Sequence, residues 1–220
     1  GVDNVASVVS HDLRNPLDVA TTRLRAGREF DEDEHFEHVA RAHERMERII
    51  QDVLTLARGE DVVDPDETVA LDTVARDAWE TVETGAATLS VDGSLPTTVA
   101  DSDRVGRLFE NLFRNSVEHG MASGEIATGR RGNSLSVTVG TLGEHRPEGF
   151  YVADDGVGIP ADERSRVFEP GYSSDDHGTG LGLAIVARIA DLHGWSYRVT
   201  AGSDGGARVE IRGLDTDSES

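Results

Sequence analysis

Two long amphipathic segments open the chain. In residues 2–28, apolar side chains from Val5 to Leu24 recur every three or four positions, which is the period of an α-helix with one buried face. Residues 34–58 repeat this period with a wider apolar stripe that includes Ile49, and a wide stripe indicates burial on more than one side. A single hairpin has too small a core to stand alone, so we expect two hairpins to form a dimeric four-helix bundle.

The pattern changes after an acidic linker at residues 61–68. Short runs that alternate apolar and polar residues indicate strands, and longer runs with a period of three to four indicate helices. The expected elements are helix 70–84, strands 87–91 and 97–100, helix 102–119, strands 135–139 and 149–154, helix 181–193, and strands 195–200 and 207–212. The predicted fold class is therefore α+β, with a hairpin over residues 1–60, a second domain over 69–214 and a frayed tail over 215–220.

The charge balance excludes several classes of function. The 220 residues hold 42 Asp and Glu against 21 Arg, with no Lys, and the formal net charge is -21. A nucleic-acid binder needs a basic face that displaces counterions, which this chain lacks. The absence of Cys excludes disulfides, thiolate nucleophiles and Cys-ligated zinc.

The acidic residues are spread along the chain, and the periodic segments argue against disorder. Attraction of a basic partner is one interpretation of this charge. We favour adaptation to molar salt, where the Debye length is ~3 Å and self-repulsion is nearly silenced. No run of 18 apolar residues occurs, and no signal peptide is evident, so neither a membrane span nor secretion is expected. The missing initiator Met suggests a fragment of a longer chain.

The first predicted helix carries a candidate nucleophile. At about 100° per residue, His11 falls opposite the apolar stripe and shares the solvent face with Asn15. A neighbouring carboxylate, Asp12, can fix the tautomer of the imidazole and leave one ring nitrogen free to attack. Pro16 has no amide hydrogen, so the carbonyl of Asp12 loses its usual helical partner and the helix is loosened one turn after His11. The alternative is a surface histidine beside a kinked helix.

Two amides mark the helix predicted at residues 102–119. Asn111 and Asn115 are four residues apart and project from one helical face. Their oxygens can ligand a hard cation such as Mg²⁺ that still carries water and nucleotide phosphates. The alternative is a pair of ordinary surface asparagines.

Two glycine-rich turns complete the candidate chemistry. Asp154 ends a predicted strand, and Gly156 and Gly158 follow it, so its carboxylate can accept a hydrogen bond from an adenine amino group while the turn lets the base approach. The alternative is an ordinary turn. A second turn opens the last predicted helix, residues 181–193, and its backbone amides can cradle phosphate. This turn consists of Gly178, Thr179, Gly180, Leu181 and Gly182. No Lys follows, so this is not a Walker loop.

Together and in this order, the four motifs resemble the H, N, G1 and G2 boxes of the sensor histidine kinases of two-component signalling. Residues 167–172 are similar to the F box between G1 and G2, and residues 45–54 resemble the end of the second dimerisation helix. The resemblance covers the chain from about residue 5 to residue 213. It implies that residues 1–60 are the dimerisation and histidine phosphotransfer domain of a homodimer. It also implies that residues 69–214 are a gyrase-like ATP-binding domain, an α/β sandwich with a mixed sheet.

The resemblance further implies the reaction and its residues. His11 would attack the γ-phosphate of ATP, Asp12 would polarise the imidazole, and the phosphoryl group would pass to an aspartate of a response regulator receiver domain. Asn15 matches the position tied to phosphatase action on that regulator. Asn115 would ligand Mg²⁺ beside the phosphates, and Asp154 would hold the adenine. The remaining pocket and lid residues would be Asn111, His119, Gly156, Gly158, Gly178, Thr179, Gly180, Leu181 and Gly182. The kinase core would be cytoplasmic, with membrane attachment only through a sensor region outside this chain.

This chain departs from the family's pattern in the lid. Asp175 and Asp176 stand near the place where the family carries cations, and Glu118 stands where a Lys is common. These departures motivate an alternative function, a catalytically weak, nucleotide-binding dimeric scaffold. A third hypothesis, a gyrase-like ATPase that hydrolyses ATP to water, requires a catalytic Glu at the position of Asn111. Glu110 is adjacent but points about 100° away.

Overall fold

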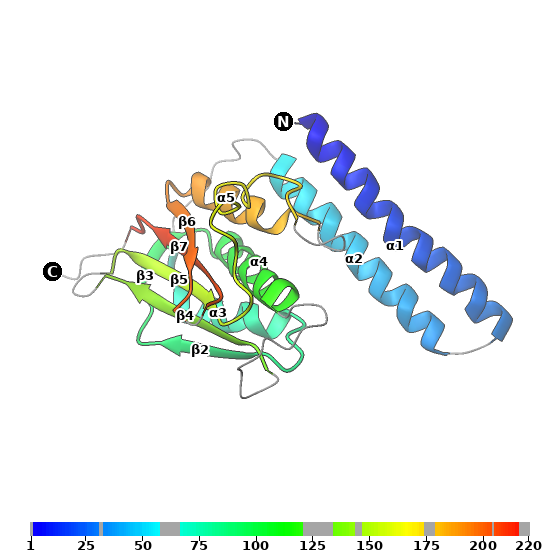
Figure 1. The fold of residues 1–220 in the computed structure, drawn as a ribbon, viewed down its shortest axis with the longest axis horizontal. Coiled ribbons are helices and arrows are strands. Elements are labelled where there is room, and N and C mark those ends of the chain that lie inside the picture. Colours follow the sequence, from blue (N-terminus) through cyan, green and yellow to red (C-terminus); the bar gives the residue numbers. More distant parts are fainter. Residues whose placement is uncertain are drawn as a thin grey trace. The chain divides into compact units, whose positions relative to one another are not determined.

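The computed structural model describes residues 2–30, 33–57, 67–120, 134–143, 147–173, 179–203 and 205–215 (Figure 1). The chain divides into two compact units. The first combines Gly1–Gly59 with Glu169–Leu181, and the second combines Glu60–Phe168 with Gly182–Ser220. Within the described residues, no helix is both long enough and apolar enough to span a bilayer.

A helical hairpin forms most of the first unit. Helix α1 spans Val2–Phe30 and helix α2 spans Asp33–Ala57, within a few residues of the predicted bounds, and the two helices pack side by side (Figure 1). Small side chains let them approach closely, because Ala20 and Ala42 are buried together with Ile49. Several large apolar side chains on the same helices remain exposed in the single chain: Leu17, Val19, Leu24, Phe36, Ile50 and Leu54.

The second unit is built on a five-stranded sheet with the order β2-β4-β5-β7-β6. The strands span Thr88–Asp92 (β2), Ser136–Leu142 (β4), Gly149–Asp154 (β5), Ser196–Ala201 (β6) and Ala207–Arg212 (β7). Strand β2 runs parallel to β4, and every other neighbouring pair is antiparallel. The sheet is therefore mixed, which confirms the predicted architecture.

Three helices form a layer against this sheet: α3 (Leu71–Thr81), α4 (Ser102–Gly120) and α5 (Gly182–Leu192) (Figure 1). Helix α4 is central, because it packs on α3 and α5 as well as on β5 and β7. Its aromatic side chains fill the interface. The Phe109 ring centroid lies 4.9 Å from that of Phe150 on β5, and Phe113 meets Trp79 of α3 edge to face at 5.2 Å. The core thus fixes the position of α4 on the sheet.

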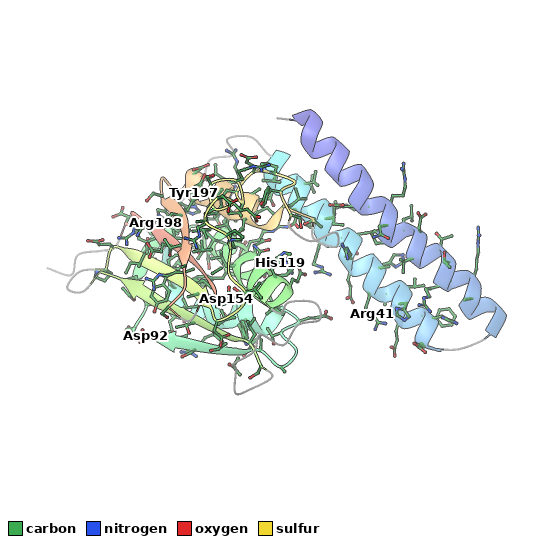
Figure 2. The ribbon with its side chains drawn as sticks, in the orientation of Figure 1. Arg41, Asp92, His119, Asp154, Tyr197 and Arg198 are labelled. Carbon is green, nitrogen blue, oxygen red and sulfur yellow. The ribbon has the colours of Figure 1, made fainter. Side chains whose placement is uncertain are left out.

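The other face of the sheet carries a row of polar side chains. Tyr151 on β5 donates a hydrogen bond to Asp92 on β2 at 3.3 Å, and the Arg208 guanidinium lies 3.7 Å from the Tyr151 ring centroid. Glu210 accepts hydrogen bonds from Arg208 and from Arg198 on β6. Arg198 and Asp92 are labelled in Figure 2. Burial alone raises the pKa of Glu210, but these arginine contacts outweigh it and lower the pKa.

Two segments differ from the sequence prediction. Strand β1 (Glu67–Ala70) was not predicted, and it pairs with β3 (Thr97–Ala100) in a separate two-stranded sheet. It overlaps the predicted linker, whose residues 61–66 lie outside the described part. The predicted frayed tail is wrong at its first residue, because the Asp215 carbonyl accepts hydrogen bonds from the Val99 amide and the Thr98 hydroxyl, each at 3.1 Å. Residues 216–220 lie outside the described part.

His193 directly follows α5 and joins the end of that helix to the residue before α4. Its Nε2 accepts a hydrogen bond from the Asp101 amide at 3.2 Å, so Nδ1 carries the proton and donates to the Ile189 carbonyl at 2.8 Å. The ring stacks on Trp195 with centroids 4.5 Å apart. Burial lowers the pKa of His193, so the ring is held neutral.

Candidate active site

Two amide side chains face α5 from helix α4. Asn111 is almost fully buried, and its Nδ2 donates to the Arg107 carbonyl one turn earlier at 2.8 Å. Asn115 lies one turn later, and its Nδ2 is buried without a hydrogen-bond partner in the described part of the chain. Because an unsatisfied buried polar atom is costly, such an amide indicates a position prepared for a ligand.

The first residue of α5 lies directly against these amides. A Cβ atom on Gly182 would stand 2.9 Å from Asn115 Oδ1, 3.1 Å from Asn115 Nδ2 and 3.4 Å from Asn111 Oδ1. Only glycine leaves both amides in place at this distance. The fold therefore joins the second and fourth sequence motifs at the N-terminus of α5, where backbone amides have no partner within the helix.

The Asp154 carboxylate closes the end of β5 and is 9% exposed. Its Oδ1 accepts hydrogen bonds from the amides of Gly156 at 2.8 Å and Ala207 at 3.2 Å, and its Oδ2 accepts from the Ser116 hydroxyl at 3.3 Å. Burial raises the pKa of Asp154, while these three donors lower it and the charge of Asp155 raises it, with a net upward shift. A buried carboxylate with a raised pKa is typical of a functional site.

Glycines allow three segments to meet around this carboxylate. A Cβ on Gly156 would stand 2.5 Å from the Gly120 Cα at the end of α4, and one on Gly206 would collide with the Asp154 carbonyl oxygen. Gly158 has a φ of +74°, which favours glycine, and a Cβ there would stand 2.6 Å from the Gly205 carbonyl oxygen. The β6–β7 turn is thus part of the site.

Sequence reasoning missed three residues of this arrangement: Ser116, Ala207 and Gly206. Ser116 directly follows Asn115 and has a hydroxyl, so its place in the motif was a usable signal. Ala207 acts through its backbone amide, which no sequence pattern could have identified.

The glycine-rich turn before α5 is described from Thr179 onward, and Gly178 lies outside the described residues. The Gly171 amide donates to the Gly180 carbonyl at 3.0 Å, and the Leu181 amide donates to the Thr179 hydroxyl at 3.4 Å. Gly180 has a φ of +63°, and its missing side chain makes room for the Gly171 backbone. These residues belong to the first unit, where the Gly171–Gly180 hydrogen bond joins the two described stretches on either side of residues 174–178.

The first motif lies on α1, as predicted. Asn15 is exposed, Asp12 is half-buried and makes polar interactions of its own, and the side chain of His11 lies outside the described part. Arg14 is exposed beside them, in agreement with the predicted solvent face. In the second unit, His119 lies half-buried in the last turn of α4 (Figure 2).

The α4 site combines neutral amide oxygens, a helix N-terminus and a buried hydrogen-bond acceptor. Asn111 and Asn115 offer hard oxygen ligands, the start of α5 favours an anion, and Asp154 accepts a hydrogen bond from a donor on an aromatic base. This set suits a Mg²⁺–nucleotide, because it recognises both a phosphate end and a base end.

Comparison with known proteins supports this interpretation. Residues 100–217 match the model for histidine kinase-, DNA gyrase B- and HSP90-like ATPases, and residues 2–62 match the model for the His Kinase A (phospho-acceptor) domain. The sensor-type histidine kinase PrrB of Mycobacterium leprae is 32% identical over 222 residues, which are 94% of this chain and 46% of that protein.

Two further similarities extend the comparison. The sensory histidine kinase/phosphatase NtrB of Rhodobacter capsulatus is 40% identical over 108 residues, which are 47% of this chain and 30% of that protein. The structure of full-length ShkA in complex with AMPPNP superposes with a TM-score of 0.61 at 24% identity, over 98% of this chain and 46% of ShkA, and shows the same fold. The chain spans less than half the length of the curated relatives named above.

Proposed function

This chain belongs to the family of histidine kinase-, DNA gyrase B- and HSP90-like ATPases, and because a phospho-acceptor domain accompanies its ATPase domain, we propose that it is the kinase core of a two-component sensor. In this proposal residues 1–60 dimerise and carry the phospho-acceptor His11, residues 61–68 link the domains, and residues 69–214 bind ATP in the cytoplasm. The observation that carries it is the unpartnered amide of Asn115 beside the N-terminus of α5.

The adenine end of ATP lies at Asp154, which accepts a hydrogen bond from the 6-amino group. Gly156 and Gly158 shape this end of the pocket, because their missing side chains let the backbones of Gly120 and Gly205 close around Asp154. The phosphate end lies near Asn111 and His119, and backbone amides in the turn before α5 bind the phosphate oxygens. That turn consists of Gly178, Thr179, Gly180, Leu181 and Gly182.

The residues around Asn115 fit a magnesium ion bound to phosphate. Its buried Nδ2 has no hydrogen-bond partner in the described part of the chain and can donate to a phosphate oxygen, while its Oδ1 is a neutral, hard ligand that Mg²⁺ accepts alongside water and phosphate. Bound there, Mg²⁺ would supply positive charge to the phosphate oxygens and fix their orientation. A neutral protein ligand leaves that charge available, which matters in a chain with a net charge of -21 and no Lys.

Phosphoryl transfer then requires positioning more than covalent chemistry from the protein. A ring nitrogen of His11 attacks the γ-phosphorus in line, a P–N bond forms, and the bond to the bridging oxygen breaks so that its electron pair leaves with ADP. Asp12 accepts a hydrogen bond from the other ring nitrogen and stabilises the charge that develops on the imidazole. The phosphoryl group then passes to an aspartate carboxylate of a response regulator receiver domain, and neutral His11 is regenerated.

The homodimer in this proposal is supported by the exposed apolar side chains of the hairpin. Leu17 is 54% exposed and Ile50 is 45% exposed, which is unusual for large apolar residues on paired helices. Pairing with a second copy would bury these positions in a four-helix bundle.

Hydrolysis of ATP to water is a weaker alternative, although the matched family includes such ATPases. A hydrolase needs a general base one turn before the metal-binding asparagine, and that position holds Asn111. A neutral amide is no base, and Asn111 is already tied to the Arg107 carbonyl. Transfer to His11 is therefore favoured.

One addition to this activity and one alternative to it rest on particular observations. NtrB is named as a kinase/phosphatase, and Asn15 is exposed on α1 one turn after His11, so we include dephosphorylation of the regulator. The alternative, a weak nucleotide-binding scaffold, is motivated by the acidic sequence of Asp175 and Asp176, which lie outside the described residues.

Labelling with γ-labelled ATP and Mg²⁺ in high salt tests the proposal. We expect an acid-labile, alkali-stable label that disappears in His11→Gln and persists in His43→Gln, a matched change at an exposed position of α2. Nucleotide binding without any label would contradict the kinase and favour the scaffold.

A further inference from the structure

Three donors from three separate segments hold the Asp154 carboxylate. The amides of Gly156 and Ala207 both donate to Oδ1, and the Ser116 hydroxyl donates to Oδ2 at 3.3 Å. An ionised carboxylate has about four lone-pair positions that can accept hydrogen bonds. The donors in the described part of the chain occupy three of them, so one acceptor position remains, and it lies on Oδ2.

We propose that Ser116 is a positioning residue that makes this site select adenine, because its hydroxyl fixes the carboxylate plane and directs the last acceptor of Asp154 toward the base. This inference rests on the proposed function, in which Asp154 binds adenine. Adenine presents a 6-amino donor to that acceptor. A base with a 6-carbonyl presents an acceptor instead, and two acceptors that face each other repel.

The hydroxyl contributes what the two backbone amides cannot. Because both amides bind one oxygen, they fix Oδ1 but leave the carboxylate able to turn about that point. A third hydrogen bond on the other oxygen removes this freedom. Ser116 is itself buried and lies next to Asn115 on the rigid helix α4, so a single turn of helix sets the base end and the phosphate end of the site together.

Selection of adenine also depends on the charge state of Asp154. A protonated carboxyl is a hydrogen-bond donor, so it would donate to the carbonyl oxygen of a 6-carbonyl base and allow that base to bind. Burial raises the pKa of this carboxyl, and the hydrogen bonds from Gly156, Ala207 and Ser116 lower it again. Loss of the Ser116 hydroxyl therefore raises the pKa of Asp154 further. As the pH is lowered, the preference for adenine should then be lost at a higher pH than in the parent chain.

The elements packed around Asp154 carry further titratable and charged groups. The loop after β5 contributes Asp155, whose charge raises the pKa of Asp154. Helix α4 carries Glu118 and His119 in its last turn. Arg208 on β7 lies over the Tyr151 ring on the opposite face of the sheet. None of these groups changes when the Ser116 hydroxyl is removed, so the comparison isolates that hydroxyl.

The test measures dissociation constants for Mg-ATP and Mg-ITP between about pH 5 and 8 in high salt, for the parent chain, Ser116→Ala and Ser116→Cys. The hypoxanthine of ITP carries a carbonyl in place of the 6-amino group. In Ser116→Ala we expect the pH at which ATP preference is half lost to rise, because one donor that lowers the pKa of Asp154 is removed. We also expect about tenfold weaker ATP binding at neutral pH, because a carboxylate that is no longer held in its plane makes a poorer hydrogen bond to the 6-amino group. Ser116→Cys keeps a weak donor and should fall between.

Thr98→Val is the matched control. It removes another buried hydroxyl, which donates to the Asp215 carbonyl, without touching the site. Its pH profile should equal that of the parent chain. An unchanged profile and ratio in Ser116→Ala would overturn this inference and leave the proposed function intact. Failure of the folded parent chain to bind ATP at all would overturn both.

Discussion

Replacing Gly182 with alanine separates the stability of the ATPase unit from its capacity to bind a nucleotide. Gly182 begins α5, where it has no need of a positive φ and where alanine is the better helix former. The methyl group would nevertheless stand 2.9 Å from Asn115 Oδ1 and 3.1 Å from Nδ2. Because these atoms end a flexible side chain, the amide can move aside by a few tenths of an ångström.

The two effects on the free energy of unfolding nearly cancel. Alanine in place of glycine in a helix gains roughly 0.5–1 kcal/mol, and pushing the Asn115 side chain off its rotamer costs about 0.5–1.5 kcal/mol. The net change should lie within about 1 kcal/mol of zero. The displaced amide no longer presents its oxygen correctly, and a lost contact to a charged group costs about 1.5–3 kcal/mol, so Mg-ATP should bind about ten- to a hundredfold more weakly.

Gly106→Ala provides the control for this change. Gly106 lies inside α4, and a Cβ there would meet only the Val74 side chain at 3.7 Å, which is ordinary contact. It should gain roughly 0.5–1 kcal/mol of stability and leave Mg-ATP affinity unchanged. Urea unfolding gives the stabilities, and calorimetric titration gives the affinities. Parent-like affinity in folded Gly182→Ala would refute a role for Asn115 in binding, and an equal loss in Gly106→Ala would refute the local explanation.

Two further predictions concern pH and salt. The pKa of His193 is lowered in the folded state, so below about pH 6.5 the unfolded state binds protons more readily than the folded state. The free energy of unfolding should therefore decrease as the pH is lowered below this value. Urea unfolding at several pH values should show this slope, and it should be weaker in His193→Gln. With a net charge of -21, the chain should lose circular dichroism in dilute buffer, and its affinity for ATP should rise with added KCl. Full structure at very low salt, or affinity that falls steadily with KCl in folded protein, would contradict the salt prediction.

Helical and strand periodicity predicted most of the elements, because burial of one face leaves a local imprint on the sequence. The long helices around Leu13 and Phe113 are clear examples. Strand β1 leaves no such imprint, since only Val69 of its four residues is buried. It exists because β3, almost thirty residues later, offers an edge to pair with.

The site was predictable to the extent that it is local. Asn111 and Asn115 share a helical face through their spacing alone. The environment of Asp154 depends on Ser116, 38 residues earlier, and on Ala207, 53 residues later, and a single sequence contains no record of such contacts. The neutral state of His193 leaves no local signal for the same reason, because the donor to its Nε2 is the amide of Asp101, 92 residues away.

Helix α4 constrains the evolution of this protein, because it contributes to both the core and the site. Phe109 and Phe113 pack into the core and Ser116 lies buried on their side of the helix, while Asn115 projects from another side of the same turns. The helix cannot shift to suit a new ligand without opening the core. Altered nucleotide preference therefore has to arise from single side-chain changes on α4, as at Ser116, or from the segments that meet it, such as the β6–β7 turn, while the helix itself keeps its position.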